Sequence, residues 1–259
     1  MVDSTSLPTD PAALFRAIAD DPTRFALFLD IDGTLLELAE TPDAIVVPPE
    51  LPRLLTDIAQ KLGGALALVT GRALPYADAL FADATLPIAG LHGAERRDFS
   101  GGITRAEPTP AFEALKRDLA RQAEDWQGII VEDKGAAVAM HFRQAPDREI
   151  DVETLMLDAA DKAGADWTLQ FGKMVVELRP AIASKGAAVT AFLSETPFTG
   201  RLPVAIGDDV TDEAMFSVAN ERGGASLRVG PAGTNTAASG SISSVADLRA
   251  ALRTIVDAS

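Results

Sequence analysis

The sequence predicts an α/β protein with a Rossmann-like core, in which helices cover both faces of a parallel sheet, and with an inserted α+β cap domain. Two patterns lead to this prediction. Near both ends of the chain, short apolar runs alternate with segments of helical spacing, as in parallel sheets. In the middle, apolar and polar residues alternate, as in antiparallel sheets with one open face. We therefore expect residues 1–105 and 182–259 to form the core and residues 106–181 to form the cap.

The first part of the core begins with Phe25–Leu29 (FALFL), which is apolar on both faces and predicts a buried strand. Residues 50–62 carry apolar side chains at helical spacing, after a proline pair and before a glycine pair. Residues 65–69 predict a second buried strand. A helix after Arg72 and a short strand near residues 87–89 continue the alternation that is typical of a parallel sheet.

The predicted cap occupies the middle of the chain. Val138, Met140 and Phe142 alternate with residues of the opposite face, which predicts a strand with one buried side. The predicted strands of this domain cover residues 128–132, 136–142, 167–171 and 175–178, and its predicted helices cover residues 111–125 and 149–163. Together they indicate a small antiparallel sheet with helices.

Parallel-sheet patterns return after the cap. Ser184 is a suitable N-cap for a helix that runs to about Leu193. Residues 204–206 predict a buried strand, and residues 225–229 predict another. An amphipathic helix over residues 245–256 closes the chain.

The composition excludes several classes of function. The formal net charge is −15, so nucleic acids and anionic membranes should be repelled. With no cysteine and two histidines, disulfides, zinc-thiolate sites and multi-histidine sites are not expected. The N-terminus lacks the basic start and apolar run of a leader, and no apolar stretch is long enough to span a membrane. We expect a cytoplasmic monomer without nucleic-acid or membrane partners.

Acidic and polar residues follow three of the predicted strands. Asp30 and Asp32 follow the first strand, and Thr70 follows the second. Asp208 and Asp209 follow the strand at residues 204–206. Because ligands of open parallel sheets bind at the carboxyl ends of the strands, we expect these side chains to meet at one edge of the sheet.

Each of these groups suits phosphoryl transfer. The Asp30 carboxylate can attack phosphorus and form an acyl phosphate. Asp32 can protonate the leaving oxygen and then deprotonate the attacking water. Mg²⁺ held by carboxylates, Asp208 among them, would neutralise the phosphoryl charge. Lys185, at the start of a helix, would add positive charge, and Thr70 with its neighbouring amides would hold a phosphate oxygen.

Two neighbours of Thr70 are further candidates. We expect Gly71 and Arg72 to contact the phosphate, although Arg72 could instead pair with a nearby carboxylate. Neither His92 nor His141 is expected to be catalytic, because His141 alternates with core residues and His92 lies in a loop near the core edge.

Taken singly, each motif has an ordinary structural interpretation. An Asp-x-Asp pair after a strand is usually a loop or a cap, and a Thr-Gly pair is usually a turn. The acids of residues 208–213 could simply begin a helix. These interpretations predict no particular order. All the pieces occur in order, each at a strand end or a helix start, and this favours catalysis.

The core motifs resemble those of the haloacid dehalogenase superfamily of phosphatases. They are DIDGTL at 30–35, VTGR at 69–72, SKG at 184–186 and GDDVTDE at 207–213. The resemblance implies that Asp30 is the nucleophile and Asp32 the general acid/base. It also implies that Mg²⁺ binds the carboxylates of Asp30 and Asp208 and the main-chain carbonyl of Asp32, with Asp209 acting nearby.

Other segments are similar to the trehalose-6-phosphate phosphatase family. They are GLHGAE at 90–95, VEDKGAAVAMHFR at 131–143 and KMVVELRP at 173–180. The similarity implies a Mg²⁺-dependent phosphatase that hydrolyses trehalose 6-phosphate to trehalose and phosphate through a phospho-aspartate. It also implies a cap that moves during turnover.

The same resemblance implies that the cap binds the sugar. The matching residues are Glu132, Lys134 and Glu177, with Lys173 as a further candidate. Period-2 spacing would put alternate residues from Lys173 to Arg179 on one face of a strand, and would pair Glu132 with Lys134 if their strand extends that far. The alternative is that these residues are solvated charges on the open face of a sheet.

Two other functions remain open at this point. The core would serve equally well in a phosphatase for sucrose phosphate or a mannosyl phosphate, because only the cap decides between sugars. A non-catalytic sugar-phosphate-binding module is the second alternative. It is disfavoured because Asp30, Asp32, Lys185 and Asp208 are all present.

Overall fold

The computed structural model describes residues 7–39, 45–81, 84–231, 233 and 235–257. The prediction that the N-terminus carries no leader falls partly on residues 1–6, which lie outside these ranges. By its internal contacts the chain divides into two compact units. The larger unit comprises residues 1–103 and 184–259, and the smaller comprises residues 104–183.

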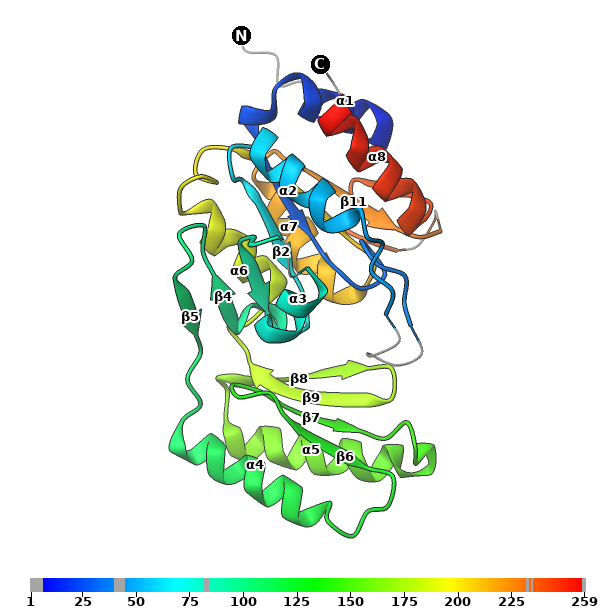
Figure 1. Cartoon of the computed structure of the whole chain (residues 1–259). Helices are drawn as coiled ribbons and strands as arrows, with labels where there is room; N and C mark the ends of the chain where they lie inside the picture. The colour runs from blue at the N-terminus through cyan, green and yellow to red at the C-terminus, as the bar shows by residue number, and fades with distance from the viewer. Residues whose placement is uncertain (1–6, 40–44, 82–83, 232, 234, 258–259) are drawn as a thin grey trace. The chain divides into compact units, whose positions relative to one another are not determined.

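The larger unit is built on an eight-stranded sheet (Figure 1). Its strands, in spatial order, are β12 (Gly240–Ile242), β11 (Ala225–Val229), β10 (Leu202–Gly207), β1 (Phe25–Leu29), β2 (Leu66–Val69), β3 (Ile88–Gly90), β4 (Glu95–Arg97) and β5 (Ile103–Arg105). The run from β12 to β3 is parallel, and β4 pairs antiparallel with β3. The predicted fold class, an α/β protein with a mainly parallel sheet, is confirmed.

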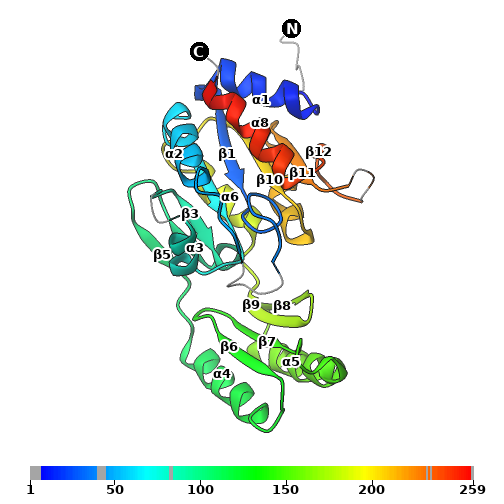
Figure 2. The same cartoon turned by 45° about the vertical axis from the view of Figure 1, so that its right-hand side comes forward.

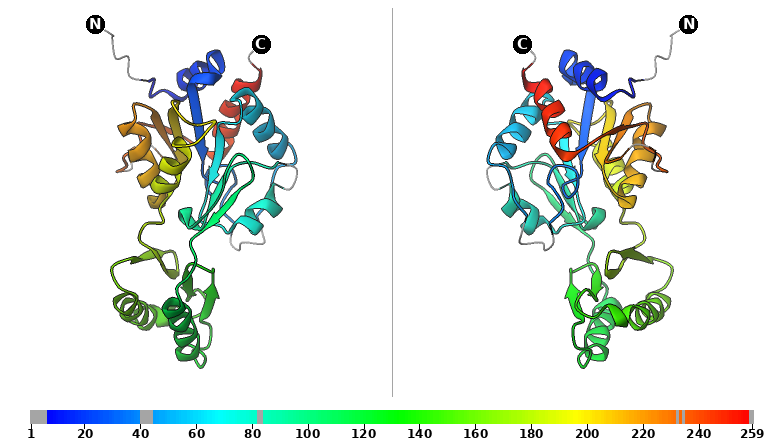
Figure 3. Two further views of the ribbon diagram at one scale, coloured as in Figure 1. Left: turned by 90° about the vertical axis from the view of Figure 1, so that its left-hand side faces the viewer. Right: turned by 90° about the vertical axis from the view of Figure 1, so that its right-hand side faces the viewer.

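Helices cover both faces of this sheet. They are α1 (Pro11–Asp20), α2 (Leu51–Lys61), α3 (Leu74–Leu80), α6 (Lys185–Leu193), α7 (Glu213–Glu221) and α8 (Val245–Asp257). Figure 3 shows α2 and α8 on one side of the strands and α6 and α7 on the other, and α1 packs against α8. None of the helices in the described ranges combines the length and apolar character that crossing a bilayer requires.

The core of the larger unit lies on both faces of β1. All five residues of β1 are buried, because the strand has parallel neighbours on both edges and helices on both faces. On one face, Phe28 stacks on Phe198 with ring centroids 5.6 Å apart, and Phe192 packs against both rings. The central strand is therefore fixed, and the residue that follows it has a defined position.

Helix caps set the helix starts that matter for the site. Ser184 accepts a hydrogen bond from the Ala187 amide at 3.0 Å, so α6 begins at Lys185, and the predicted N-cap is confirmed. Helix α1 was not predicted, although Asp10 caps it by accepting from the Ala13 amide at 2.9 Å. The strands β4, β5 and β12 were also missed, since each has only three residues, too few to show a clear alternation.

The smaller unit has a four-stranded antiparallel sheet with two helices on one face (Figure 2). Its strands, in spatial order, are β6 (Ile130–Asp133), β7 (Val138–His141), β9 (Val175–Pro180) and β8 (Trp167–Gly172). Helices α4 (Pro110–Gln122) and α5 (Glu149–Ala163) bury Phe112, Val152 and Met156 against it. The opposite face carries no helix in the described part of this unit.

Two details of this sheet differ from the sequence-based expectation. Strand β9 begins at Val175, and Met174 before it has φ 62°, so the strand's alternation does not reach Lys173. Strand β6 ends at Asp133, so Lys134 belongs to the turn that follows. The side chains of Lys173 and Lys134 are therefore not placed by strand alternation.

Candidate active site

The ends of three neighbouring parallel strands bring the core motifs together. Asp30 follows β1, Thr70 follows β2 and Asp208 follows β10. The chain turns sharply at Gly33, whose φ of 75° is a left-handed conformation that glycine adopts without steric cost. A Cβ on Gly33 would lie 2.1 Å from a carboxylate oxygen of Asp208, so the glycine also lets the two acidic loops approach.

Lys185 lies at the centre of the site. Its Nζ donates to Asp30 Oδ1 and to Asp212 Oδ1, both at 2.6 Å, and it is only 3% exposed. Burial disfavours the ammonium, but the two carboxylates outweigh this effect and hold the pKa of Lys185 above its ordinary value. The amine therefore stays charged, and it fixes the orientation of the Asp30 carboxylate.

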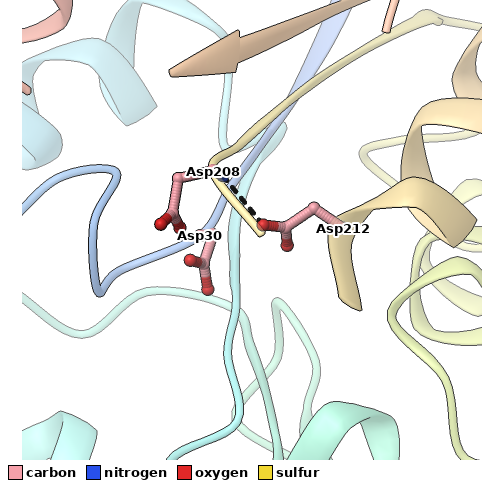
Figure 4. Close-up of side chains that lie close together, drawn as sticks. All are labelled: Asp30, Asp208 and Asp212. Carbon is pink, nitrogen blue, oxygen red and sulfur yellow. Dashed lines mark hydrogen bonds between the residues drawn. The ribbon is translucent and has the colours of Figure 1, made fainter. Parts of the chain in front are cut away.

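Asp30, Asp208 and Asp212 form an acidic cluster, with one carboxylate oxygen of each within 4.8 Å of the others (Figure 4). Three ionised carboxylates and the Lys185 ammonium leave a formal charge of −2. Burial and repulsion between the acids raise the pKa of Asp30 well above its ordinary value and raise the pKa of Asp208 to about 6. Carboxylate oxygens are preferred by hard divalent cations, whose charge would balance the cluster. The cluster could therefore hold a metal ion.

Asp212 is a site residue that the sequence-based assignment missed. It is fully buried, and its Oδ2 accepts from the backbone amides of Asp208 and Asp209 at 2.9 and 3.0 Å. Its Oδ1 accepts from Lys185. Both oxygens thus hold other parts of the site, so Asp212 positions the Asp208 loop and the amine. The only sequence signal was its place in the acidic segment after β10.

Asp209 has a different environment from Asp208. Its carboxylate accepts from the Val210 amide at 2.7 Å, which caps the short turn Val210–Asp212, and the residue is exposed. Asp209 is not a member of the acidic cluster described above. Its predicted role near the metal stays a prediction.

Asp32 is held by Arg72. The guanidinium donates Nε to Asp32 Oδ2 at 2.5 Å and Nη2 to Oδ1 at 2.6 Å, which is a bidentate pair. Arg72 also lies over the Tyr76 ring, 4.3 Å from its centroid. Arg72 was expected either to contact the phosphate or to pair with a nearby carboxylate, and in the structure it pairs with Asp32. The Arg72 amide donates to Thr70 Oγ1 at 3.1 Å, so Thr70, Gly71 and Arg72 form one compact loop.

In the smaller unit, charged groups gather on the sheet face opposite the helices. Lys134 Nζ donates to Glu177 Oε2 at 2.7 Å. Glu177 is 6% exposed, and its buried Oε1 has no hydrogen-bond partner among the described residues. His141 Nε2 lies 2.8 Å from Glu132 Oε2, and this hydrogen bond lowers the pKa of Glu132. Three of the four predicted sugar-binding residues thus belong to the Lys134–Glu177 ion pair or to the Glu132–His141 hydrogen bond.

Two further charged residues of this unit, Lys173 and Arg179, have different surroundings. Lys173 lies in the exposed turn between β8 and β9. Arg179, which was not assigned a role, donates Nε to Gln170 Oε1 at 2.8 Å. Its buried Nη1 has no hydrogen-bond partner within the described ranges. Period-2 spacing puts Arg179 on the same face as Glu177, so it extends the polar surface along β9.

Similarity to known proteins extends over most of the chain. The sequence profile of the Trehalose-phosphatase family matches residues 28–248. The chain is 59% identical over 233 residues to a probable trehalose-phosphate phosphatase of Sinorhizobium fredii, covering 90% of this chain and 88% of the relative. It is 43% identical over 218 residues to trehalose-6-phosphate phosphatase of Escherichia coli, covering 82% and 79%.

Solved structures show the same fold at lower identity. The C-terminal domain of C. albicans trehalose-6-phosphate phosphatase has a TM-score of 0.78 at 21% identity, with 96% of each chain covered. A trehalose-6-phosphate phosphatase related protein has a TM-score of 0.73 at 24% identity, covering 89% of this chain and 96% of the other. At these identities the likeness concerns the fold.

Proposed function

Since the chain belongs to the trehalose-phosphatase family, we propose that it hydrolyses trehalose 6-phosphate to trehalose and phosphate, with Asp30 as the nucleophile. The observation that carries the assignment of Asp30 is its carboxylate, which is buried at the end of β1 and oriented by Lys185 at 2.6 Å. A carboxylate held in this way is a competent nucleophile toward phosphorus. The alternatives of sucrose phosphate or a mannosyl phosphate are disfavoured by the family membership.

The reaction has two steps. Asp30 Oδ attacks phosphorus, the bond from phosphorus to the sugar oxygen breaks, and Asp32 gives that oxygen a proton. A water molecule then attacks the phospho-aspartate, Asp32 takes a proton from it, and phosphate leaves Asp30 as a free carboxylate. Lys185 balances the charge of the reacting groups throughout.

Mg²⁺ suits the donor set of the core site. The carboxylates of Asp30 and Asp208 and the main-chain carbonyl of Asp32 would hold it, and Asp212 would position Asp208 from behind. All these donors are oxygens, and the cluster's formal charge of −2 matches a divalent ion. When bound there, Mg²⁺ supplies Lewis-acid stabilisation of the phosphoryl oxygens.

Asp32 must leave its present partner before it can act as an acid. The bidentate pair with Arg72 occupies both carboxylate oxygens of Asp32, so neither oxygen is free to meet the leaving sugar oxygen. We infer that the substrate phosphate competes for the Arg72 guanidinium and releases Asp32. Arg72 would then bind phosphate oxygens together with Thr70 and the Gly71 amide. Both interpretations of Arg72 would thus describe successive states of one residue.

The proposal is tested by phosphate release from a panel of sugar phosphates, with Mg²⁺ and with a chelator. Trehalose 6-phosphate should be the preferred substrate, and its hydrolysis should stop when the metal is removed. Preference for sucrose phosphate or a mannosyl phosphate would move the specificity to another sugar. Absence of release from every member of the panel would contradict the proposed function.

Mg²⁺ is expected to raise the melting temperature more at pH 7.5 than at pH 5. The pKa of Asp208 is about 6, so its carboxylate is charged at the higher pH and largely protonated at the lower one. Protons therefore compete with the metal at pH 5. Because a ligand that binds only the folded state stabilises it by RT ln(1 + [L]/Kd), the shift in melting temperature at a fixed Mg²⁺ concentration reports the affinity.

Two neighbouring variants provide the matched control for this metal prediction. Asp208→Asn should lose the Mg²⁺-dependent shift at both pH values. Asp209→Asn should keep it, because the Asp209 carboxylate caps the Val210 amide and lies outside the acidic cluster. Loss of the shift only in Asp209→Asn would contradict the proposal, because it would show that the metal depends on Asp209 and not on Asp208.

We infer that the sugar hydroxyls bind to Glu132, Lys134 and Glu177 of the smaller unit, which acts as the cap. The support is the buried Oε1 of Glu177, which lacks a hydrogen-bond partner among the described residues. A buried acceptor of this kind is costly unless a donor reaches it, and sugar hydroxyls are donors. Lys173 and Arg179 are secondary candidates for the same role.

Glu177→Gln is expected to lower kcat/KM for trehalose 6-phosphate by about 10- to 100-fold, since a hydrogen bond to a charged acceptor is replaced by a weaker one. Hydrolysis of a small aryl phosphate, which has no sugar hydroxyls, should be unchanged. Glu149→Gln, the same exchange on the exposed side of α5, is the control and should match the wild type on both substrates. An equal loss on both substrates would show that Glu177 does not select the sugar.

We further infer that the protein is a cytoplasmic monomer that meets neither nucleic acid nor membrane. The formal net charge of −15 supports the absence of nucleic-acid and membrane partners, because it repels polyanions and anionic lipid surfaces. The absence of cysteine from the sequence suits a reducing compartment. The substrate anion would then be attracted only locally, by Lys185, Arg72 and the metal.

A further inference from the structure

The GLHGAE segment, residues 90–95, packs against the loop that begins at Thr70. The His92 amide donates to the Thr70 carbonyl at 2.9 Å, and the Leu91 amide donates to the Arg72 carbonyl at 3.0 Å. We propose that this segment is a brace that positions Thr70–Arg72 for the reaction, with Glu95 as its positioning residue. The inference rests on the proposed function, because Thr70–Arg72 is the loop assigned to the phosphate.

Glu95 anchors the far end of the loop. Its side chain is buried, 7% exposed, and its Oε1 accepts from the Leu74 amide at 2.5 Å. Leu74 is the first residue of α3, where backbone amides lack partners within the helix. The N-cap position is occupied by Ala73, which has no side-chain acceptor. Glu95 supplies the missing acceptor from 21 residues away, so it fixes where the loop ends and the helix starts.

The brace and the loop are in close contact at two glycines. A Cβ on Gly71 would lie 2.7 Å from ring atoms of His92, and a Cβ on Gly90 would lie 2.7 Å from the Arg72 carbonyl oxygen. Side chains larger than glycine would therefore push the two segments apart. The backbone contact that holds Thr70 and Arg72 depends on this approach.

The brace has an uncommon backbone conformation. Leu91 and His92 have φ values of 49° and 55°, a left-handed region that costs free energy for residues other than glycine. Two such residues in succession persist only where the surroundings fix them, and such conformations gather at functional sites. Here they turn both amides toward carbonyls of the Thr70–Arg72 loop.

The same segment also touches the helix that carries Lys185. A Cβ on Gly93 would lie 2.8 Å from the Ser184 carbonyl oxygen. Ser184 is the N-cap of α6, and Lys185 is its first residue. The brace therefore lies between the Thr70–Arg72 loop and the start of α6, and it sets the spacing between the groups proposed to bind phosphate and the amine that orients Asp30.

The test compares kcat and KM for trehalose 6-phosphate in wild type, Glu95→Gln and Glu95→Leu. Leucine removes the acceptor for the Leu74 amide, so we expect kcat to fall by about 10- to 100-fold, as for a catalytic group displaced by roughly 1 Å. Glutamine keeps an acceptor oxygen and should restore kcat to within about threefold of the wild type. A wild-type kcat in a folded Glu95→Leu protein would overturn the brace, as would an equal loss in Glu95→Gln.

Asp78→Asn is the matched control. Asp78 lies on α3 and forms a bidentate pair with Arg97 of β4, at 2.7 and 2.8 Å. The variant loosens the same helix from the same strand without touching its first turn. It should lower the melting temperature and leave kcat unchanged. Failure of the proposed function would be recognised separately, because the wild-type protein itself would then show no phosphatase activity.

A second pair of variants tests the contact if Glu95→Leu does not fold. Gly71→Ala should lower kcat because its Cβ meets the His92 ring. His92→Gly removes that ring, and glycine adopts the left-handed backbone without steric cost. The kcat of the double variant Gly71→Ala/His92→Gly should therefore be at least about tenfold higher than that of Gly71→Ala. No recovery in the double variant would overturn the steric part of the brace.

Discussion

Replacing Asp30 with asparagine is expected to lower kcat for trehalose 6-phosphate by at least about 1,000-fold. Asparagine has the shape of aspartate, but its amide cannot form the acyl phosphate through which the proposed reaction passes. The remaining residues can still position substrate and water, so the residual rate measures what the site achieves without covalent catalysis. The measurement is phosphate release at saturating substrate and Mg²⁺.

The same variant should fold at least as stably as the wild type at pH 7.5 when no metal is added. The pKa of Asp30 is raised above its ordinary value, so its ionised form is disfavoured in the folded chain, and this cost grows as the pH rises above the unfolded pKa. A neutral amide removes the cost. Asp158→Asn, which breaks an exposed ion pair with Lys162 on α5, should keep full activity. Activity of Asp30→Asn within about tenfold of the wild type would exclude Asp30 as the nucleophile.

The parts of the fold that the sequence predicted are those with local signals. The apolar run Phe25–Leu29 is central strand β1 because burial on both faces requires continuous apolar residues. Ser184 caps the start of α6 because its hydroxyl can accept a hydrogen bond from an amide three residues ahead. The strand ends then put Asp30, Thr70 and Asp208 at one edge of the sheet. Each of these steps depends on residues within one turn or one strand.

The parts that were not predicted depend on residues far apart in the chain. Two adjacent acids follow β10, and only the turn beginning at Val210 decides that Asp208 faces Asp30 while Asp209 caps an amide. Asp212 becomes a site residue because its carboxylate reaches back to the Asp208 amide and across to Lys185. No periodicity in a single sequence encodes these contacts.

The smaller unit shows the same limit for strand boundaries. Alternation predicted that Lys173 would share a face with Glu177, but the left-handed Met174 ends the alternation one residue before β9. Lys134 lies outside β6, yet its long side chain still reaches Glu177 at 2.7 Å. Spacing therefore identified charged residues on this sheet, whereas their pairing depended on the turns.

Replacing Lys185 with methionine is expected to lower both activity and stability, and its stability loss should shrink at low pH. The ammonium is buried between Asp30 and Asp212 at 2.6 Å from each, so methionine leaves two buried carboxylates without their cation. Removing one partner of a buried ion pair costs about 3–5 kcal/mol. Loss of the Lys185 charge beside the reacting groups should lower kcat by about 100- to 1,000-fold.

The pH dependence follows from the acids that remain. Without Lys185 the pKa values of Asp30 and Asp208, already raised, rise further in the folded state, so the folded chain takes up protons that the unfolded chain does not. Folding stability measured by denaturant unfolding should therefore differ less from wild type at pH 5 than at pH 7.5.

Lys116→Met is the control, since Lys116 is also buried between two carboxylates, Glu113 and Asp133, but lies in the smaller unit. It should lose stability and keep kcat at saturating substrate; equal loss of kcat in both variants would mean that Lys185 acts only through stability.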